Sequence, residues 1–422
     1  MAHTAAAVAA LGLTKPNVVE PLQVSFAAIG IEPSDWEGDV LAVAVTEKDV
    51  CRSPGSSFEN AVLKRLDSQL GGLLSEASAE EDFAGKAGTV LGLYEDNRYR
   101  SESNKVHLKQ VDLIGLGYGP EMDHRLELAK HVSSGVIFGK DLVNSPANVL
   151  TPVVLAEEAS KIASMYSDVF TATILNEERC RELKMGSYLA VAAASANPPR
   201  FIHLCYKPSG GNVKRKLAIV GKGVTFDSGG YNIKIGAVCN IELMKWDMGG
   251  SAAVFGAAKA LGQIKPPGVE VDNTDAEGRL TLADALVYAC KQGVDKIIDL
   301  ATLTGFCRVA LGPSIAGILT PSDELHEEVA AASEVSGEKF WRLPLEESYW
   351  ETMKSGVADM LNTGAIPQGG VITAALFLKQ FVDEKVQWMH MDIAGPVWSH
   401  KNRSATGFGV STMVEWVLKN SS

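Results

Sequence analysis

Three short segments of this chain place carboxylates, a lysine and glycines together in patterns that serve metal or phosphate chemistry. The first segment, Val220–Gly230, reads VGKGVTFDSGG and directly follows an apolar run, with Lys222 and Asp227 standing among its glycines. Ligands of α/β proteins usually bind beyond the carboxyl ends of strands, where this segment is expected to lie. A phosphate-binding loop and a structural glycine-rich turn stay open as alternatives, although neither common glycine-rich phosphate motif is matched.

The second segment is Asn273–Leu280, NTDAEGRL, which precedes a run of apolar residues with helical spacing. Alternate side chains of an extended chain point to the same side, so Asp275, Glu277 and Arg279 are predicted to project together. The competing interpretation is a helix N-cap with acidic residues in the first turn, where the helix dipole favours negative charge.

A third carboxylate, Asp247, stands in the sequence KWDMGG before a run of small residues, where a capping role is the simpler alternative. Together with Asp227, Asp275 and Glu277 it supplies four negative charges, which two divalent cations would neutralise. Oxygen donors without His or Cys favour magnesium, manganese or zinc. Two such ions about 3.5–4 Å apart can share a hydroxide and polarise a carbonyl group, which is hydrolytic chemistry.

The elements that must position these residues alternate between strand-like and helix-like runs, which is typical of an α/β fold. We expect a smaller N-terminal α/β domain over residues 1–120, with a flexible tail over residues 1–21, a linking helix over residues 121–140 and a larger catalytic domain over residues 141–422.

In the first domain we expect strands at Val40–Val45 and Val111–Gly117. Between them, apolar residues that recur every four positions behind Ser57 predict an amphipathic helix, namely Phe58, Val62, Leu66 and Leu70.

In the larger domain, strands rich in Val and Ile alternate with helices, which predicts a mostly parallel central sheet covered by helices on both faces. The expected strands are Leu217–Val220, Lys296–Leu300 and Val386–Ile393. The expected helices are Val153–Tyr166, Gly249–Ile264, Leu280–Lys291 and Thr373–Val382.

The composition narrows the class of partner and the compartment. A formal net charge of −12 does not favour duplex nucleic acid or an anionic membrane as the main partner. The six cysteines include no CxxC pair, so neither a zinc knuckle nor a redox dithiol is indicated, and reduced thiols in the cytoplasm fit best. The chloroplast is less favoured because residues 1–21 are poorer in Arg and Ser than a transit peptide, and the apolar run Ala5–Leu13 is too short to span a bilayer.

Five motifs of the larger domain, GKGVTFDSGG, YNIK, KWDMGG, NTDAEGRL and ATLTG in this order, resemble the signature series of the cytosol aminopeptidase family, peptidase M17. The sequences of these motifs are most similar to those of the plant leucine aminopeptidases of that family. The resemblance extends over NSPANVLTP, WMHMDIAGP and ATGFGV, whereas the first domain matches more loosely. It implies a metal-dependent aminopeptidase that releases N-terminal amino acids, preferably Leu and similar apolar residues, from peptides with a free N-terminus.

Carried over position by position, the resemblance implies a role for each matching residue. Two divalent ions, zinc or manganese with magnesium as a further option, would be held by Lys222, Asp227, Asp247, Asp275 and Glu277. Lys234 would help to polarise the scissile carbonyl, and Arg279 would hold a bicarbonate that serves as general base. The first side-chain pocket would be lined by Met244, Thr302, Leu303 and Gly305, with core packing an equal alternative for Met244. The family also implies a homohexamer.

Two stretches that the family carries are absent from this chain. Between Asp247 and Asp275 the family has a further strand and loop, whereas here Gly268–Val271 runs directly into Asp272. The first domain is also shorter, because residues 83–86 pass almost directly to residues 89–93. Either the deletion is covalent, as in a splice variant, or stretches are left out of the sequence.

These absences define the alternative function, a catalytically impaired deletion variant that acts as an oligomeric binding or chaperone-like protein. The loop at residues 362–370 also lacks the arginine that the family usually has there. DNA binding, which some bacterial members show, would need a basic groove that the net charge does not favour.

Overall fold

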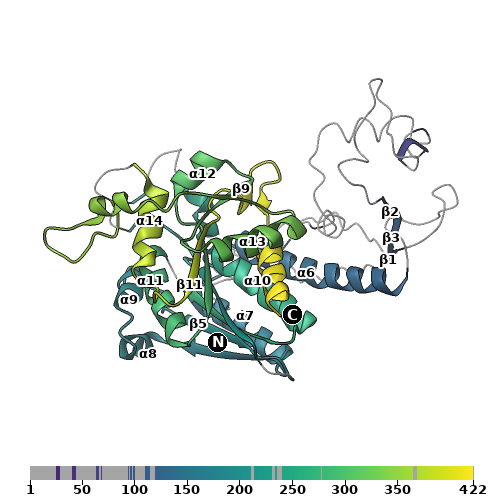
Figure 1. The fold of residues 1–422 in the computed structure, drawn as a ribbon, viewed down its shortest axis with the longest axis horizontal. Helices are drawn as coiled ribbons and strands as arrows, with labels where there is room; N and C mark the ends of the chain where they lie inside the picture. Colours follow the sequence, from purple (N-terminus) through teal and green to yellow (C-terminus); the bar gives the residue numbers. More distant parts are fainter. Residues whose placement is uncertain are drawn as a thin grey trace, which may run out of the picture. The chain divides into compact units, whose positions relative to one another are not determined.

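The structure is a computed structural model that describes residues 25–28, 40–43, 63–65, 68, 94, 96, 98–99, 110–114, 119–210, 213–230, 233–234, 240–276, 278–364 and 368–421. For residues 25–28, 40–43, 110–114 and 273–276 the description covers the backbone. The chain divides into two compact units, Met1–Lys130 and His131–Ser422 (Figure 1).

In the first unit, three short strands form a parallel sheet in the order β1-β3-β2. The strands are β1 Ser25–Ala28, β2 Val40–Val43 and β3 Gln110–Ile114. The two strands expected here are confirmed over Val40–Val43 and Val111–Ile114, and the remaining predicted residues, 44–45 and 115–117, lie outside the described residues. Residues 63–65 and 68 are helical, whereas the apolar residues that predicted the amphipathic helix, Phe58, Val62, Leu66 and Leu70, lie outside the described residues.

Two helices precede the sheet of the second unit. Helix α6, Pro120–Asn144, begins in the first unit and ends in the second. In the segment NSPANVLTP the helical course breaks, and helix α7, Pro152–Met165, then starts. Thr151 caps α7 by accepting a hydrogen bond from the backbone nitrogen of Val154, and a proline opens its first turn. The predicted break and helix are confirmed.

An eight-stranded sheet forms the centre of the second unit, in the order β10-β9-β11-β8-β6-β7-β5-β4. The pairs β10·β9, β11·β8, β8·β6 and β6·β7 are parallel, and the pairs β9·β11, β7·β5 and β5·β4 are antiparallel. The predicted mostly parallel sheet is thus confirmed. The strands are β4 Phe170–Leu175, β5 Phe201–Tyr206, β6 Arg215–Lys222, β7 Val269–Ala276, β8 Lys296–Ala301, β9 Ile315–Leu319, β10 Lys339–Arg342 and β11 Gln387–Asp392.

Helices cover both faces of this sheet (Figure 1). On one face, α10 packs against β6 and β8 and contacts α7 and α15, and α13 lies beside α15. On the other face, α11 packs against β6 and β7 and contacts α9 and α14. The helices are α8 Glu177–Glu182, α9 Gly186–Ala192, α10 Gly249–Ile264, α11 Gly278–Lys291, α12 Gly305–Leu311, α13 Asp323–Ser336, α14 Gly370–Lys379 and α15 Val410–Asn420.

Burial on both faces explains why the central strands are apolar runs rather than alternating patterns. Residues Leu217–Val220 of β6 and every residue of β8 are buried. The predicted helix Gly249–Ile264 is confirmed at both ends, whereas α14 starts three residues before the predicted Thr373, after Gly369 in a left-handed conformation. Two 3-10 helices, η3 Ile241–Met248 and η4 Glu347–Met353, and a short pairing of β12 Trp398–Ser399 with β13 Ser404–Ala405 complete the unit as described.

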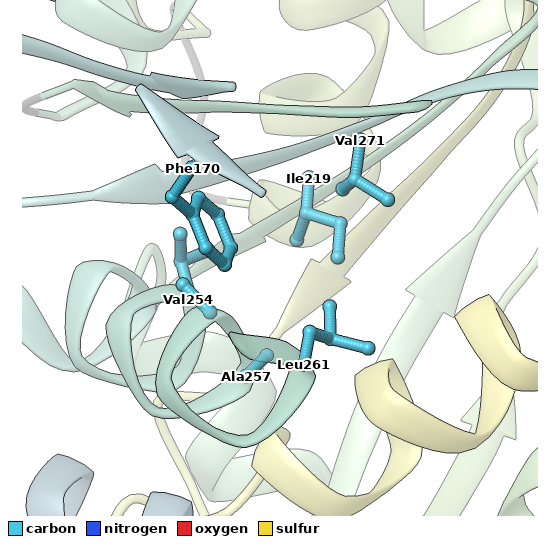
Figure 2. Close-up of a pocket in the computed structure, with 7 residues that line it drawn as sticks. Phe170, Ile219, Val254, Ala257, Leu261 and Val271 are labelled. Atoms are coloured by element: carbon cyan, nitrogen blue, oxygen red, sulfur yellow. The ribbon is translucent and has the colours of Figure 1, made fainter. Parts of the chain in front are cut away.

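A small apolar cavity lies where α10 meets the sheet (Figure 2). It measures about 10 Å³ and is lined by Phe170, Ile219, Val254, Ala257, Ala258, Leu261 and Val271. A cavity of this size and polarity stays dry and holds no ligand. Its position shows that Val271 of β7 faces α10 within the core.

Candidate active site

Lys222, Asp247 and Thr302 form a buried group at the ends of two central strands. The ammonium group of Lys222, at the end of β6, donates hydrogen bonds to Asp247 Oδ1 at 2.6 Å and to the carbonyl oxygen of Thr302 at 3.2 Å. The hydroxyl group of Thr302, directly after β8, donates to the same carboxylate oxygen at 2.8 Å. The structure therefore brings three of the predicted residues together, with Lys222 and Thr302 both bonded to the carboxylate of Asp247.

Gly250 allows this approach. A Cβ at Gly250 would lie 2.0 Å from the carbonyl oxygen of Leu300 and 2.7 Å from the backbone nitrogen of Lys222, so only glycine fits. The start of α10 can therefore sit against the ends of β6 and β8, and Asp247 in η3 is carried with it. No side chain caps α10, and Asp247 does not serve as its N-cap.

The environment of Asp247 disfavours a lone negative charge. Burial raises the pKa of the Asp247 carboxyl to about 6, and the nearby charge of Asp227 adds to this, while Lys222 and Thr302 oppose it. Asp247 Oδ2 is buried and has no hydrogen-bond partner among the described residues. A buried carboxylate oxygen without a donor is costly, and a cation is the partner that suits it.

Asp227 and Lys234 form a second pair of predicted site residues. Lys234 Nζ lies 2.9 Å from Asp227 Oδ2, and each side chain is about one-third exposed, at 32% and 33%. The other carboxylate oxygen of Asp227 accepts a hydrogen bond from the backbone nitrogen of Gly229 at 2.9 Å. The predicted catalytic lysine is therefore held against a predicted metal ligand.

The extended course predicted from Asp275 to Arg279 is wrong at Arg279. Strand β7 ends at Ala276, and α11 begins at Gly278, whose φ of 56° is left-handed, so Arg279 stands in the first helical turn. Because a helix turns by about 100° per residue, Arg279 does not continue the alternation of the strand that contains Asp275. Asp275 pairs in register with Gly221 of β6, while its side chain and the whole of Glu277 lie outside the described residues.

Arg279 faces a different set of partners. Its guanidinium donates to the carbonyl oxygen of Asn362 at 2.7 Å, and burial lowers its pKa while the charge of Asp392 opposes that shift. Asp392 is itself buried at the end of β11 and accepts hydrogen bonds from the backbone nitrogen of Leu303 at 3.2 Å and the hydroxyl of Thr304 at 2.6 Å. Sequence reasoning did not single out Asp392, although a carboxylate at the end of an apolar strand is a usable signal.

The four residues predicted to line a side-chain pocket are placed differently from one another. Thr302 is buried and its hydroxyl contacts Asp247, so it positions the carboxylate. Met244 and Leu303 are partly buried, and Gly305 is exposed at the start of α12. A larger cavity of about 500 Å³ at α8, α9 and residues 192–199 contains none of the predicted site residues.

The donors at the end of β6 fit a divalent cation. Asp227 and Asp247 supply carboxylate oxygens, one of which lacks a partner, and Lys222 supplies a nitrogen once its proton is lost.

Among the described helices, none combines the length and apolar character needed to cross a membrane.

Comparison with known proteins gives one family. The model of the cytosol aminopeptidase family, catalytic domain, matches residues 137–269 and 268–414. Leucine aminopeptidase 2, chloroplastic, of Oryza sativa subsp. japonica is 65% identical, with 100% of this chain and 89% of that protein covered. Leucine aminopeptidase 1 of Arabidopsis thaliana is 57% identical with full coverage of both chains. A solved structure of a tomato leucine aminopeptidase mutant matches with a TM-score of 0.85 and 49% identity, over 97% of this chain and 99% of that one.

The comparisons also locate an internal shortening. The rice alignment runs over 533 positions whereas the chain has 422 residues, so at least 111 positions have no residue of this chain. The family match is split at residues 268–269, within the interval between Asp247 and Asp275 where a strand and loop were predicted to be absent.

The predicted cytoplasmic location is wrong. Relatives from rice, Arabidopsis and tomato at 65%, 57% and 55% identity are named chloroplastic. Composition misled here because it describes the whole chain, whereas a compartment is specified by short signals that receptors read.

Proposed function

Because this chain belongs to the cytosol aminopeptidase family, we propose that it removes N-terminal amino acids, preferably leucine and similar apolar residues, from peptides with a free amino group. The family and its relatives support peptide hydrolysis. The observation that carries the proposal is the unpartnered Oδ2 of buried Asp247 next to Lys222.

The family is metal-dependent, and the proposed holders of two divalent ions are Lys222, Asp227, Asp247, Asp275 and Glu277. The pair of ions, zinc, manganese or magnesium, supplies Lewis acidity and an activated water when bound. Lys222 and Thr302 fix Asp247 from one side and leave its other oxygen for a cation. Lys222 would ligate an ion only as the neutral amine, because the ammonium group has no lone pair.

Lys234 and Arg279 are the proposed catalytic side chains. Lys234 lies against Asp227 and, when turned toward the substrate, donates to the oxygen of the scissile carbonyl, where negative charge develops. Arg279 is held by the backbone of Asn362 and presents a planar cation that suits a bicarbonate ion, the proposed general base.

The wider assignments rest on the relatives. We place the protein in the chloroplast, as the names of similar proteins from rice and tomato indicate for those proteins. The catalytic domain is proposed to span residues 141–422 and to assemble as a homohexamer, for which light scattering of the purified protein is the measurement. A mass of six chains supports the assembly, and a monomer contradicts it.

A second candidate function follows from the split family match at residues 268–269. With the shortening, β7 begins at Val269 and contains Asn273–Ala276 of the NTDAEGRL motif. If this prevents two ions from binding, the chain is an oligomeric binding or chaperone-like protein.

Hydrolysis of a leucyl amide by the purified chain with added manganese separates the two functions. Chelator-sensitive cleavage of this substrate, with no cleavage of its N-acetylated counterpart, supports the aminopeptidase because the free amine is required. Absence of cleavage by folded, metal-loaded protein supports the binding protein.

A further inference from the structure

Strands β5 and β7 present polar side chains on the face opposite α10. Side chains alternate along a strand, so with Val271 facing α10, its neighbours Glu270 and Asp272 face the α11 side. Cys205 pairs directly with Asp272 across the antiparallel pair, and His203 stands two residues along the same strand. Nitrogen, sulfur and oxygen donors therefore meet on one face.

The distances between these donors suit a single metal ion. His203 Nε2 lies 3.1 Å from Asp272 Oδ1, and ligand atoms of His203, Cys205 and Asp272 all lie within 4.8 Å of one another. Zinc bonds of roughly 2.0–2.3 Å to nitrogen, oxygen and sulfur place tetrahedral ligand atoms roughly 3.2–3.8 Å apart. A fourth donor is at hand, because Glu270 Oε1 lies 3.7 Å from Cys205 Sγ.

The imidazole of His203 is already oriented for this role. Its Nδ1 lies 3.1 Å from the hydroxyl of Tyr288 in α11, and the two rings stand edge to face at 5.4 Å. Metal-binding histidines characteristically use the second ring nitrogen for such a hydrogen bond, which fixes the tautomer and the ring plane. With Nδ1–H donated to Tyr288, the lone pair of Nε2 points toward Asp272 and Cys205.

The same contacts argue against thiol catalysis. Burial raises the pKa of the Cys205 thiol, and the charge of Asp272 raises it further, so the free thiol is a poor nucleophile. The sulfur of Cys205 donates to the carboxylate of Glu270, a weak base, whereas the imidazole of His203 contacts Asp272 and Tyr288. Cys205 is only partly buried, and solvent ions can therefore reach it.

The cluster joins the two parts of the split family match. His203 and Cys205 belong to the part that covers residues 137–269, whereas Asp272 belongs to the part that covers residues 268–414. The cluster therefore spans the point at which the family match is divided.

We infer that His203, Cys205, Asp272 and Glu270 bind one zinc ion that ties β5 to β7 across the family break. On binding, the thiol proton of Cys205 leaves to solvent and the sulfur becomes a thiolate ligand. The inference does not depend on the proposed peptidase activity, since none of these four residues is assigned to it. Soft and borderline donors distinguish the site from the oxygen-rich centre at Asp247.

Cobalt substitution tests this site in the full chain. Metal-free protein titrated with Co²⁺ is expected to develop the near-ultraviolet charge-transfer absorption of a cobalt–thiolate bond. The centre at Asp247 cannot give this signal because its proposed ligands include no cysteine. The Cys205→Ser variant is expected to lose the band and to bind one ion fewer. The control variant Cys290→Ser removes another partly buried thiol, on α11, and is expected to keep the band and the full number of bound ions.

Protection from alkylation provides a second readout that needs no variant. Zinc is expected to slow the reaction of Cys205 with iodoacetamide at least tenfold, as measured by mass spectrometry, and to leave Cys290 unchanged. The inference is overturned if the parent chain shows no cobalt–thiolate band, if the band persists in Cys205→Ser, or if zinc leaves the alkylation of Cys205 unaltered.

Discussion

Asp247 and Asp272 are both buried beside a basic side chain, yet their surroundings differ in donor chemistry. Asp247 is held by Lys222 at 2.6 Å and keeps one oxygen without a partner, among oxygen donors and one amine. Asp272 lies 3.1 Å from His203 and next to the sulfur of Cys205. Hard donors with an open oxygen suit ions that activate water, whereas nitrogen and sulfur donors suit a closed structural ion. The comparison shows that burial and charge alone do not specify what a carboxylate does.

The largest expected effect comes from Asp247→Asn. The amide cannot hold a dication as a carboxylate does, so leucyl amide hydrolysis is expected to fall by at least about 10²–10³-fold, with loss of bound manganese. Steady-state kinetics and metal analysis measure both. Asp168→Asn, at an exposed acid paired with Lys265, is the matched control. Full activity of Asp247→Asn would remove this residue from the active site.

Lys222→Met tests the pairing itself. It leaves the Asp247 carboxylate buried without its cation, and the free energy of unfolding of the metal-free protein is expected to fall by about 3–5 kcal/mol at neutral pH. Urea denaturation measures it. Lys296→Met removes an equally buried lysine of β8, but one of its partners, Glu324, is 61% exposed, so a smaller loss is expected. Equal losses in the two variants would contradict the special cost at Asp247.

Thr302→Val tests how Asp247 is positioned. Loss of one hydrogen bond to a charged group is expected to lower kcat/KM about tenfold and to weaken manganese binding, while the fold is kept. Thr320→Val removes another buried hydroxyl, which donates to the carbonyl oxygen of Trp388 at 2.6 Å, and controls for packing. Unchanged metal affinity in Thr302→Val would show that the hydroxyl does not position the carboxylate.

The smallest expected effect concerns Glu338 and the dependence of stability on pH. Both carboxylate oxygens of Glu338 accept hydrogen bonds. It accepts hydrogen bonds from the backbone nitrogens of Gly409 at 2.7 Å and Thr412 at 3.0 Å, at the start of α15. Burial raises the pKa of Glu338 in the folded state, so its protonation favours folding at low pH and this contribution is lost as pH rises through the folded pKa.

The free energy of unfolding of the parent chain minus that of Glu338→Gln is therefore expected to be larger at pH 4 than at pH 7. Urea denaturation at both values measures the difference, with Glu327→Gln at an exposed position of α13 as the control for charge. A difference between parent and Glu338→Gln that grows with pH would contradict the direction of the shift.

Much of the fold was predictable because its signals are local. The run Gly249–Ile264 of small and apolar residues predicted α10 at both ends, and the apolar runs of β6 and β8 predicted buried strands. The course of Asp275 to Arg279 was not predictable from alternation, because Gly278 in a left-handed conformation starts a helix there. The roles of Asp392 and of the pair His203 and Cys205 were missed, since neither carries a spacing motif.

The sequence by itself determined the α/β class and the family and supplied the candidate residues for hydrolysis, because periodicity, glycine chemistry and motif order lie along the chain. Only the tertiary structure decided that Lys222 holds Asp247, that Thr302 joins them from 55 positions away, and that Asp272 meets His203 from 69 positions away. These contacts depend on strand order and register, which many distant residues set together.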